Sequence, residues 1–503
     1  MSIPLLSTLI FFPILGGLSL LIVPRQEAAT IRIMALIISL IECLLCLPIM
    51  LLFDKTTHLM QFTEHHAWIT ALGSNYALGI DGISVLFVFL TALIIVVSVL
   101  VSWESITTKV PEFFISLLLL EGAMMGVFCA TDLFLFYIFW EAMLIPMFLI
   151  IGIWGGPNRI YATVKFFLYT LVGSLLMLAG IILLYQNGGQ TFDLLKLSGQ
   201  AYPLKLQLIL FWAFFAAFAV KVPMWPLHTW LPDAHTEAPA AGSVILAGVL
   251  IKMGAYGFLR FSLPILPDAS QQMLLPMLIL SVIAIVYGAI ICLAQTDLKR
   301  LIAYSSVSHM GFVTLGLFAL NRHGLEGGIL QMINHGLVTG ALFLAVGMIY
   351  ERTHTREIAA YGGLATTMPV FAGFFLLFTL AAVGLPGTNG FIGEFLILLG
   401  SFERLPWTAV VAASGLILGA WYMLWLYQRV FFQEVKPAME GLAPLNLREI
   451  LTLSPLVLLI LWIGLYPNGL LGFLHVSVGH LLDQVNTVGL AGPVLPIAPG
   501  GQP

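Results

Sequence analysis

Charged residues are scarce in this sequence. Only 9% of its 503 residues are Asp, Glu, Lys or Arg, 60% are hydrophobic, and the mean hydropathy is +1.04. A soluble domain needs a polar surface that this composition does not provide, so a soluble protein is excluded. The net charge of −4 also leaves no basic face, which excludes a nucleic-acid partner.

Cysteines and cofactor motifs are scarce as well. Cys43, Cys46, Cys129 and Cys292 all lie inside or at the ends of apolar runs, which indicates neither disulfides nor a metal cluster. The sequence contains no Walker loop, dinucleotide fingerprint or haem attachment motif. We therefore expect no cofactor and no metal in this chain, and we expect any redox chemistry to occur in another subunit.

Long apolar runs are abundant. A membrane span needs roughly 20 mostly apolar residues, and such runs recur almost to residue 475. The first run lacks a basic flank and a cleavage site, so we interpret it as a helix rather than a signal peptide. The sequence predicts an all-α, polytopic membrane protein of about 14 transmembrane helices. The expected spans are 3–23, 31–53, 82–102, 110–130, 133–154, 161–185, 206–222, 240–264, 271–294, 298–319, 327–349, 367–385 continuing at 391–402, 407–430 and 449–474.

The basic residues predict the orientation. With the N-terminus outside, the inward joints and flanks hold Arg25, Arg32, Lys109, Arg159, Lys165, Lys299, Arg300, Arg352, Arg356, Arg429, Lys436 and Arg448. The outward joints hold only Lys55, Lys196, Lys205, Arg260, Arg322 and Arg404. The positive-inside rule therefore places both termini outside. Lys221 and Lys252 are left without a loop position.

The order of the spans predicts two inverted five-helix repeats. Each repeat has an interrupted helix, with breaks at residues 222–226 and 385–390. Interrupted backbone at membrane depth persists where protein or a wet cavity satisfies it, and such breaks are typical of transport sites. We expect an N-terminal three-helix segment, two repeat halves, and a C-terminal helix with tail, at 1–109, 110–264, 271–430 and 431–503.

Several ionisable residues lie inside the apolar runs. Each costs about 2.5–3.5 kcal/mol near the bilayer centre, and burial brings lysine and glutamate closer to proton exchange at neutral pH. The principal candidates for a proton relay are Glu141, Lys221, Lys252, His309, His335 and Glu394. The two histidines could bridge Lys252 and Glu394, since imidazole passes protons through two nitrogens. A structural ion pair, snorkelling of Lys221 and hydrogen-bonded packing histidines are the alternatives.

Secondary candidates lie in mid-span and beside the first break. Glu121 lies in the middle of the fourth predicted span, where a structural role is the alternative. His228, Asp233 and His235 follow the first break, but no third close nitrogen or sulfur ligand accompanies them. A metal site there is therefore not expected.

The sequence resembles the antiporter-like subunits shared by respiratory complex I and multisubunit sodium/proton antiporters. The resemblance covers nearly the whole chain and is most specific at residues 219–235, 295–311 and 385–395. It implies that Glu141 and Lys221 form a switchable pair at an inward half channel, with Lys252 as the central relay. His309 and His335 would connect that relay to Glu394 at the exit. Glutamate at position 394 resembles one subtype, because other family members commonly have lysine there.

The resemblance also implies the setting of the chain. It implies that the chain lies in a bacterial inner membrane. Its expected partners are membrane lipids and other membrane-arm subunits, including neighbouring antiporter-like subunits. Quinone reduction elsewhere in the complex would drive proton movement through it. FMN, iron–sulfur clusters and quinone are expected in those other subunits. Two rival hypotheses remain: a subunit of a sodium/proton antiporter or related membrane hydrogenase, and a structural subunit whose charges only hold helices together.

Overall fold

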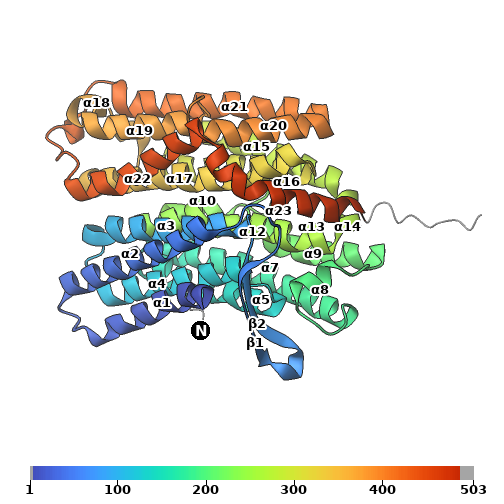
Figure 1. Ribbon diagram of the computed structural model, residues 1–503. Helices are drawn as coiled ribbons and strands as arrows, with labels where there is room; N and C mark the ends of the chain where they lie inside the picture. The colour runs from blue at the N-terminus through green and yellow to red at the C-terminus, as the bar shows by residue number, and fades with distance from the viewer. Residues whose placement is uncertain (1–3, 488–503) are drawn as a thin grey trace, which may run out of the picture.

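The computed structural model describes residues 4–487, which form a bundle of roughly parallel helices (Figure 1). The helices are α1 Leu5–Ser19, α2 Ala28–Leu52, α3 Ser84–Ser105, α4 Val110–Cys129, α5 Leu133–Ala142, α6 Leu144–Trp154, α7 Arg159–Asn187, α8 Leu194–Ser198, α9 Leu204–Lys221, α10 Trp230–Glu237, α11 Ala240–Ile245, α12 Ile251–Gly257, α13 Leu263–Ile265, α14 Pro267–Gln272, α15 Leu274–Leu293, α16 Leu298–Phe318, α17 Arg322–Thr353, α18 Leu364–Thr367, α19 Pro369–Ala382, α20 Asn389–Arg404, α21 Pro406–Tyr427, α22 Leu447–Leu465 and α23 Asn468–Thr487. The strands are β1 Gln61–Ile69 and β2 Ser74–Ile80.

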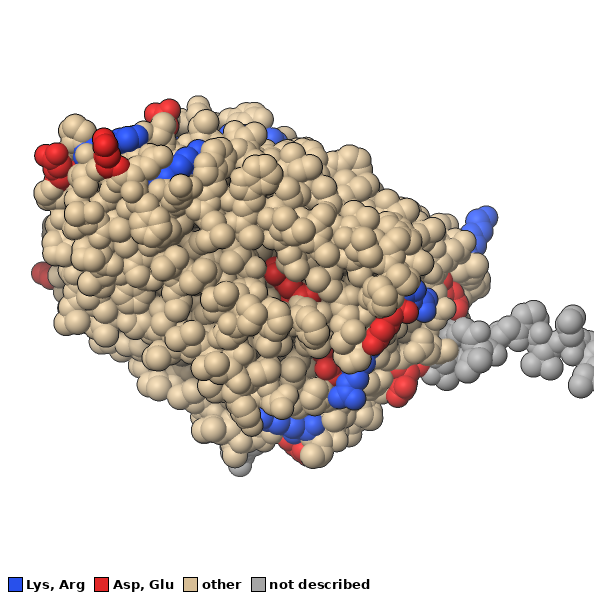
Figure 2. Space-filling view, turned by 90° about the horizontal axis from the view of Figure 1, so that it is seen from above, with Lys and Arg blue, Asp and Glu red and all other residues tan. Residues whose placement is uncertain are grey.

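Thirteen helices within the described residues are long and apolar enough to cross a membrane, and α19 is a shorter apolar helix. The expected membrane-embedded, helical fold is confirmed. Nearly all of the continuous helix Ala240–Ile265 is buried in the bundle, whereas only about a third of the apolar part of Leu5–Ile22 and of Pro406–Phe432 is buried. In Figure 2 charged side chains gather near two ends of the visible face and leave a broad, almost uncharged band between them. Such a band suits contact with lipid.

Within the described residues, a third break follows α22 in addition to the two expected helix interruptions. The first break separates α9 from α10 and the second separates α19 from α20, as the Pro and Gly residues predict. The expected single span 449–474 is wrong, because α22 ends at Leu465 and α23 begins at Asn468, after Pro467. A Cβ at Gly464 would lie 2.4 Å from the Gly387 carbonyl oxygen, so the second and third breaks lie side by side.

A two-stranded antiparallel hairpin, β1 and β2, joins α2 to α3. The sequence predicted the two flanking spans but not this hairpin. The Asp132 carboxylate fixes the hairpin to the bundle, since it accepts hydrogen bonds from Ser74 Oγ at 3.1 Å and from the Asn75 backbone at 2.9 Å. We call this end of the bundle the hairpin end and the other the opposite end.

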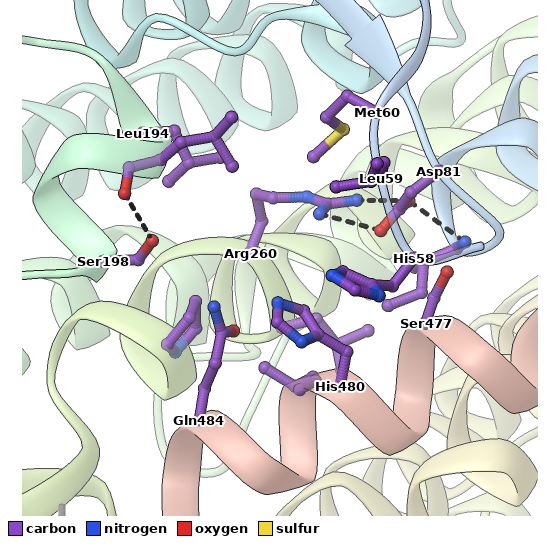
Figure 3. Close-up of a pocket in the computed structure, with 15 residues that line it drawn as sticks. His58, Leu59, Met60, Asp81, Leu194, Ser198, Arg260, Ser477, His480 and Gln484 are labelled. Carbon is purple, nitrogen blue, oxygen red and sulfur yellow. Dashed lines mark hydrogen bonds and ion pairs between the residues drawn. The ribbon is translucent and has the colours of Figure 1, made fainter.

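Ion pairs fix both ends of the bundle. At the hairpin end Arg260 donates to Asp81 at 2.6 and 3.0 Å beside a cavity of about 140 Å³, which the stacked rings of His58 and His480 also line (Figure 3). Burial opposes ionisation of Asp81, but the Arg260 guanidinium outweighs it and holds the pKa of that carboxyl below its usual value.

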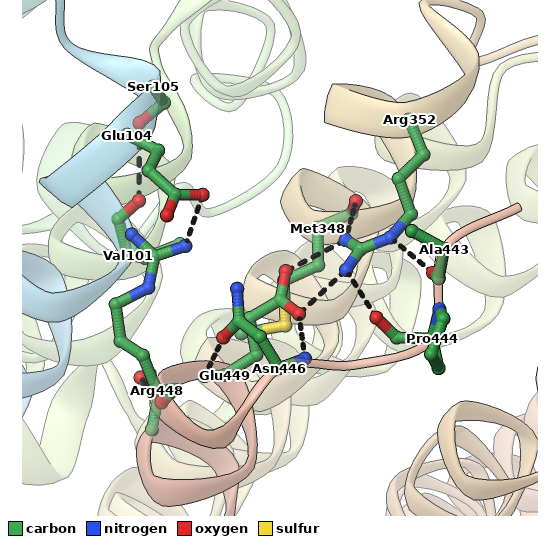
Figure 4. Close-up of polar contacts among 11 residues, drawn as sticks. Val101, Glu104, Ser105, Met348, Arg352, Ala443, Pro444, Asn446, Arg448 and Glu449 are labelled. Carbon is green, nitrogen blue, oxygen red and sulfur yellow. Dashed lines mark hydrogen bonds and ion pairs between the residues drawn. The ribbon is translucent and has the colours of Figure 1, made fainter.

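At the opposite end two further ion pairs join α3, α17 and α22 (Figure 4). Arg352 donates to both oxygens of Glu449 at 2.7 Å, and Arg448 donates to Glu104 at 2.8 Å. Glu449 also completes a capping box with Asn446 at the start of α22. These contacts fix both ends of the bundle, between which the buried charges lie.

Candidate functional site

Lys252 lies on the buried central helix and is fully shielded from solvent. A wide π-helical turn at Leu246–Leu250 precedes it, and such turns recur at functional positions. The Lys252 ammonium donates to the Ala247 carbonyl of that turn and lies 2.6 Å from His335 Nδ1 on α17. The lysine without a loop position therefore has a titratable partner at the core of the bundle.

A continuous row of side chains leads from Lys252 to Glu394. The rings of His335 and His309 meet edge to face with centroids 5.7 Å apart. His309 Nδ1 lies 3.0 Å from Glu394 Oε1. The second nitrogen of His335, Nε2, has no hydrogen-bond partner among the described residues. Both histidines line a cavity of about 10 Å³, which has room for about one water. The row thus joins α12, α17, α16 and α20 through groups that can each carry a proton.

Glu394 lies on the first turns of α20, just beyond the second break. Its Oε1 also accepts a hydrogen bond from Gln331 at 3.1 Å, and its Oε2 lies 3.0 Å from the Cβ position of Gly384. A side chain at Gly384, where φ is +73°, would crowd this carboxylate. The break therefore makes room for a carboxyl group among buried helices.

Glu141 and Lys221 lie on adjacent helices but are not in direct contact. Lys221, the last residue of α9, points its Nζ at the Trp140 ring, 5.3 Å from the centroid, and at Phe166, 5.8 Å away. Neither Lys221 Nζ nor Glu141 Oε1 has a hydrogen-bond partner in the described structure. Their charges are close enough to interact, with aromatic rings rather than an ion pair beside the lysine.

The secondary candidates divide into two groups. His235 is wholly buried, stacks on Phe343 with centroids 4.5 Å apart, and lies within electrostatic range of Lys252. His228 packs edge to face on Tyr287, with its two ring nitrogens unpartnered. Asp233, in contrast, takes Lys165 at 2.7 Å and Arg300 at 3.4 Å as ion-pair partners.

Glu121 lies apart from this row. It is on α4, within electrostatic range of Glu42 on α2. The row from Lys252 to Glu394 does not include it.

Lys299 and Glu42 are among the buried charged residues that reasoning from the sequence missed. Lys299 is only 7% exposed, donates to the Ala238 carbonyl and lies near His235, although it was counted among the loop residues. Its position two residues after the helix cap Asp297 hid its burial. Glu42 is fully buried in α2, and its isolation in an apolar run was the same signal that singled out Lys252.

No group of three or more metal-ligating side chains occurs among residues 4–487. The buried polar groups of the row are proton carriers: an ammonium, two imidazoles and a carboxylate. The arrangement can pass protons one link at a time across the middle of the bundle.

Known proteins resemble this chain over nearly its whole length. Residues 130–420 match the family model described as NADH:quinone oxidoreductase/Mrp antiporter, TM. The chain is 50% identical to NADH-quinone oxidoreductase subunit M of Rhodobacter capsulatus, covering 95% of this chain and 96% of that protein. It is 48% identical to NADH-ubiquinone oxidoreductase chain 4 of Marchantia polymorpha, with 95% and 97% covered.

Solved structures agree with these relatives. A chain of respiratory complex I from Thermus thermophilus superimposes with a TM-score of 0.88 at 34% identity, covering 95% of this chain and 99% of that one. A chain of the Mrp complex from Dietzia shares the fold, with a TM-score of 0.84 at 20% identity and 96% and 98% covered. The chain therefore belongs to the NADH:quinone oxidoreductase/Mrp antiporter family of membrane subunits.

Proposed function

We propose that this chain is the proton-translocating subunit M of NADH:quinone oxidoreductase, a membrane-arm subunit of respiratory complex I that carries no redox centre itself. The observation that carries the proposal is the row Lys252, His335, His309 and Glu394, whose neighbouring groups lie within contact of one another. Relatives that bear the name subunit M or chain 4 match over the full length, and this supports the same assignment.

Each link of the row has a role in proton transfer. Lys252 gives its proton to His335 Nδ1 across 2.6 Å, which leaves a neutral amine in the apolar core. His335 releases a proton from Nε2 through the water-sized cavity to His309, and His309 passes one from Nδ1 to Glu394. Each transfer moves a charge between buried groups. The protonation state of one group therefore changes the free energy of protonating the next.

Glu141 and Lys221 form the entry side of the path. Lys221 has only aromatic faces for its ammonium, so a change in the charge of Glu141 alters the energy of the protonated lysine directly. His235 and Lys299 lie between the opposite end and Lys252, and they extend the entry side. The first break frees the end of α9 to position Lys221 there.

We assign the chain to a bacterial inner membrane, with both termini and the hairpin end on the periplasmic side. The asymmetric distribution of Lys and Arg supports this orientation. Neighbouring antiporter-like subunits and lipids cover the apolar band, and FMN, iron–sulfur clusters and quinone reside in other subunits. Residues 110–264 and 271–430 form the two inverted halves, each with one break.

A sodium/proton antiporter subunit or a related membrane hydrogenase subunit is the rival assignment. The chain shares 20% identity with the Mrp chain, against 44–50% with the subunit M relatives, and this difference favours the respiratory complex. Purification of the intact complex tests the assignment, since NADH- and quinone-reducing subunits should co-purify.

The relay itself is tested by Lys252→Met, which keeps the side-chain length but cannot carry a proton. Lys196→Met is the matched control, because Lys196 is a surface lysine 3.6 Å from Asp193. In inverted membrane vesicles we expect assembled complex in both variants, with NADH-driven proton uptake lost only in Lys252→Met. Proton uptake at the parental rate in Lys252→Met would refute the role of the row.

A further inference from the structure

Two buried carboxyl groups, Glu42 and Glu121, lie outside the row described above. Glu42 is in the middle of α2 and Glu121 in the middle of α4, and both are 0% exposed. Among residues 4–487, none of their four carboxyl oxygens has a hydrogen-bond partner, although α2 and α4 pack together. Each carboxyl is within electrostatic range of the other.

In the part of the chain that the structure describes, the helices packed around the two carboxyls carry no Lys or Arg at this depth. On α2 the nearest basic residue is Arg32, ten residues and about 15 Å along the helix from Glu42. Near α4 the nearest basic residue in sequence is Lys109, which precedes the helix and lies twelve residues, or about 18 Å, from Glu121. The remaining titratable groups within electrostatic range of the pair are the thiols of Cys43, Cys46 and Cys129, and the Glu64 carboxylate lies within range of Cys129.

Two unpartnered carboxylates cannot both remain charged in such surroundings. A buried ion costs several kcal/mol even after relaxation, and a like charge nearby adds to that cost. A proton on one of the two carboxyls removes one of these charges. Two carboxyls without a third ligand offer a metal ion too few partners, so a proton is the ligand that this arrangement fits.

A cluster of polar groups lies on the hairpin side of this level. The Glu64 carboxylate of β1 accepts hydrogen bonds from Ser7 Oγ and the Leu6 backbone, and Ser7 Oγ lies 2.7 Å from Tyr76 Oη. Gly122, beside Glu121, packs on the Ile10 carbonyl and the Ile14 side chain of α1. The carboxyl level therefore lies about 8 Å along α1 from Ser7.

We propose that Glu42 and Glu121 form a second proton-binding site, which holds at least one proton at neutral pH and exchanges it with the hairpin end through Ser7, Tyr76 and Glu64. The site is separate from the Lys252 row, since it lies among α1, α2 and α4. The protonation of Glu42 and Glu121 does not depend on the proposed function. Only the side of the membrane with which the site exchanges its proton rests on the orientation proposed above.

Protonation is tested with dicyclohexylcarbodiimide, a membrane-soluble reagent that adds to carboxylic acids rather than to carboxylates. Inverted vesicles containing the intact complex are treated at pH 7, and peptides of α2 and α4 are analysed by mass spectrometry. We expect an adduct on Glu42 or Glu121 and none on Glu112, which is on the same helix as Glu121 but forms an ion pair with Arg25 at 3.0 Å.

An infrared measurement makes the test independent of reagent access. The parent complex should show a protonated carboxyl band at pH 7 that disappears in the Glu42→Gln, Glu121→Gln double variant. An unchanged band would overturn the proposal, as would labelling that sodium ions suppress at constant pH.

Exchange with the hairpin end is tested by setting the pH on the two sides of the vesicles independently. Labelling should fall several-fold when the pH is raised on the hairpin side alone, and the response should be slower in Ser7→Ala. Ser19→Ala is the matched control, because Ser19 at the other end of α1 bonds only the Gly16 carbonyl of its own helix. Labelling that follows the pH of the opposite side would refute the route.

Discussion

Replacing Glu394 with glutamine removes one ionisable group from the row while preserving its shape. The amide oxygen of glutamine can accept the same hydrogen bonds from His309 and Gln331, now 3.0 and 3.1 Å long. Each bond to a charged acceptor contributes about 1.5–3 kcal/mol and each bond to a neutral acceptor about 0.5–1.5 kcal/mol, so the two bonds together lose about 2–3 kcal/mol. Relief from burying a charge offsets most of that loss. We therefore expect the complex to assemble normally.

The transport consequence is much larger than the stability consequence. Glutamine cannot take the proton that His309 offers, so the last link of the row is broken. We expect at least a tenfold loss of NADH-driven quenching of a pH dye in inverted vesicles, with partial retention in Glu394→Asp and Glu394→Lys, which can still carry a proton. Glu403→Gln is the control, because Glu403 is on the same helix but is a 43% exposed partner of His323. If Glu394→Gln pumps like the parent, the exit role of Glu394 and the relay through it are both wrong.

Three further predictions concern other parts of the chain. Glu141→Gln and Lys221→Met should each impair proton uptake, and their effects should be non-additive in a double-mutant cycle, because their charges interact; additive losses would mean that they act separately. Asp81→Asn should destabilise the complex at pH 7 by about 3–5 kcal/mol, because it leaves Arg260 unpaired. Since the pKa of Asp81 is lowered, its stabilising charge is present above about pH 4 and is lost as the pH falls through the folded-state pKa. The difference between the melting temperatures of the parent and of Asp81→Asn should therefore become smaller in acid. A difference that does not change with pH would contradict the ion pair. Gly464→Val should reduce the thermal stability of the complex, since a Cβ there meets the neighbouring break at 2.4 Å; an unchanged melting temperature would mean that the two breaks separate easily.

The sequence predicted the helices and the buried charges because both are local signals. Apolar runs mark the spans, and one ionisable residue in such a run, such as Lys252, is conspicuous without any knowledge of its neighbours. The contact of Lys252 with His335 joins residues 83 positions apart, and that of His309 with Glu394 joins residues 85 apart. No periodicity reports on such contacts, so the sequence could suggest the bridge but not its geometry.

The errors have equally specific causes. The hairpin at 61–80 is partly exposed and joins two helices, so hydropathy registers only a polar gap. The third break, at Pro467, follows an apolar run that is already long enough for a complete span. Its sequence therefore did not indicate an interruption within the predicted span 449–474. Lys299 was counted with the loop residues because it lies in the first turn of α16. In the structure its ammonium is buried and donates to the Ala238 carbonyl, directly after α10.

The wide turns on either side of Lys252 give its helix a mechanical property that ordinary helices lack. Leu246–Leu250 and Phe258–Ser262 are both π-helical, and each stores one extra residue in a helix otherwise packed tightly on all sides. If such a turn moves by one position, one backbone hydrogen bond is exchanged and the residues it passes rotate by about 100°. A rotation of that size at residue 252 would carry the ammonium away from His335 while both ends of the helix stayed in place. A shift of either π-helical turn would therefore make or break the contact between Lys252 and His335 through a rotation inside the bundle.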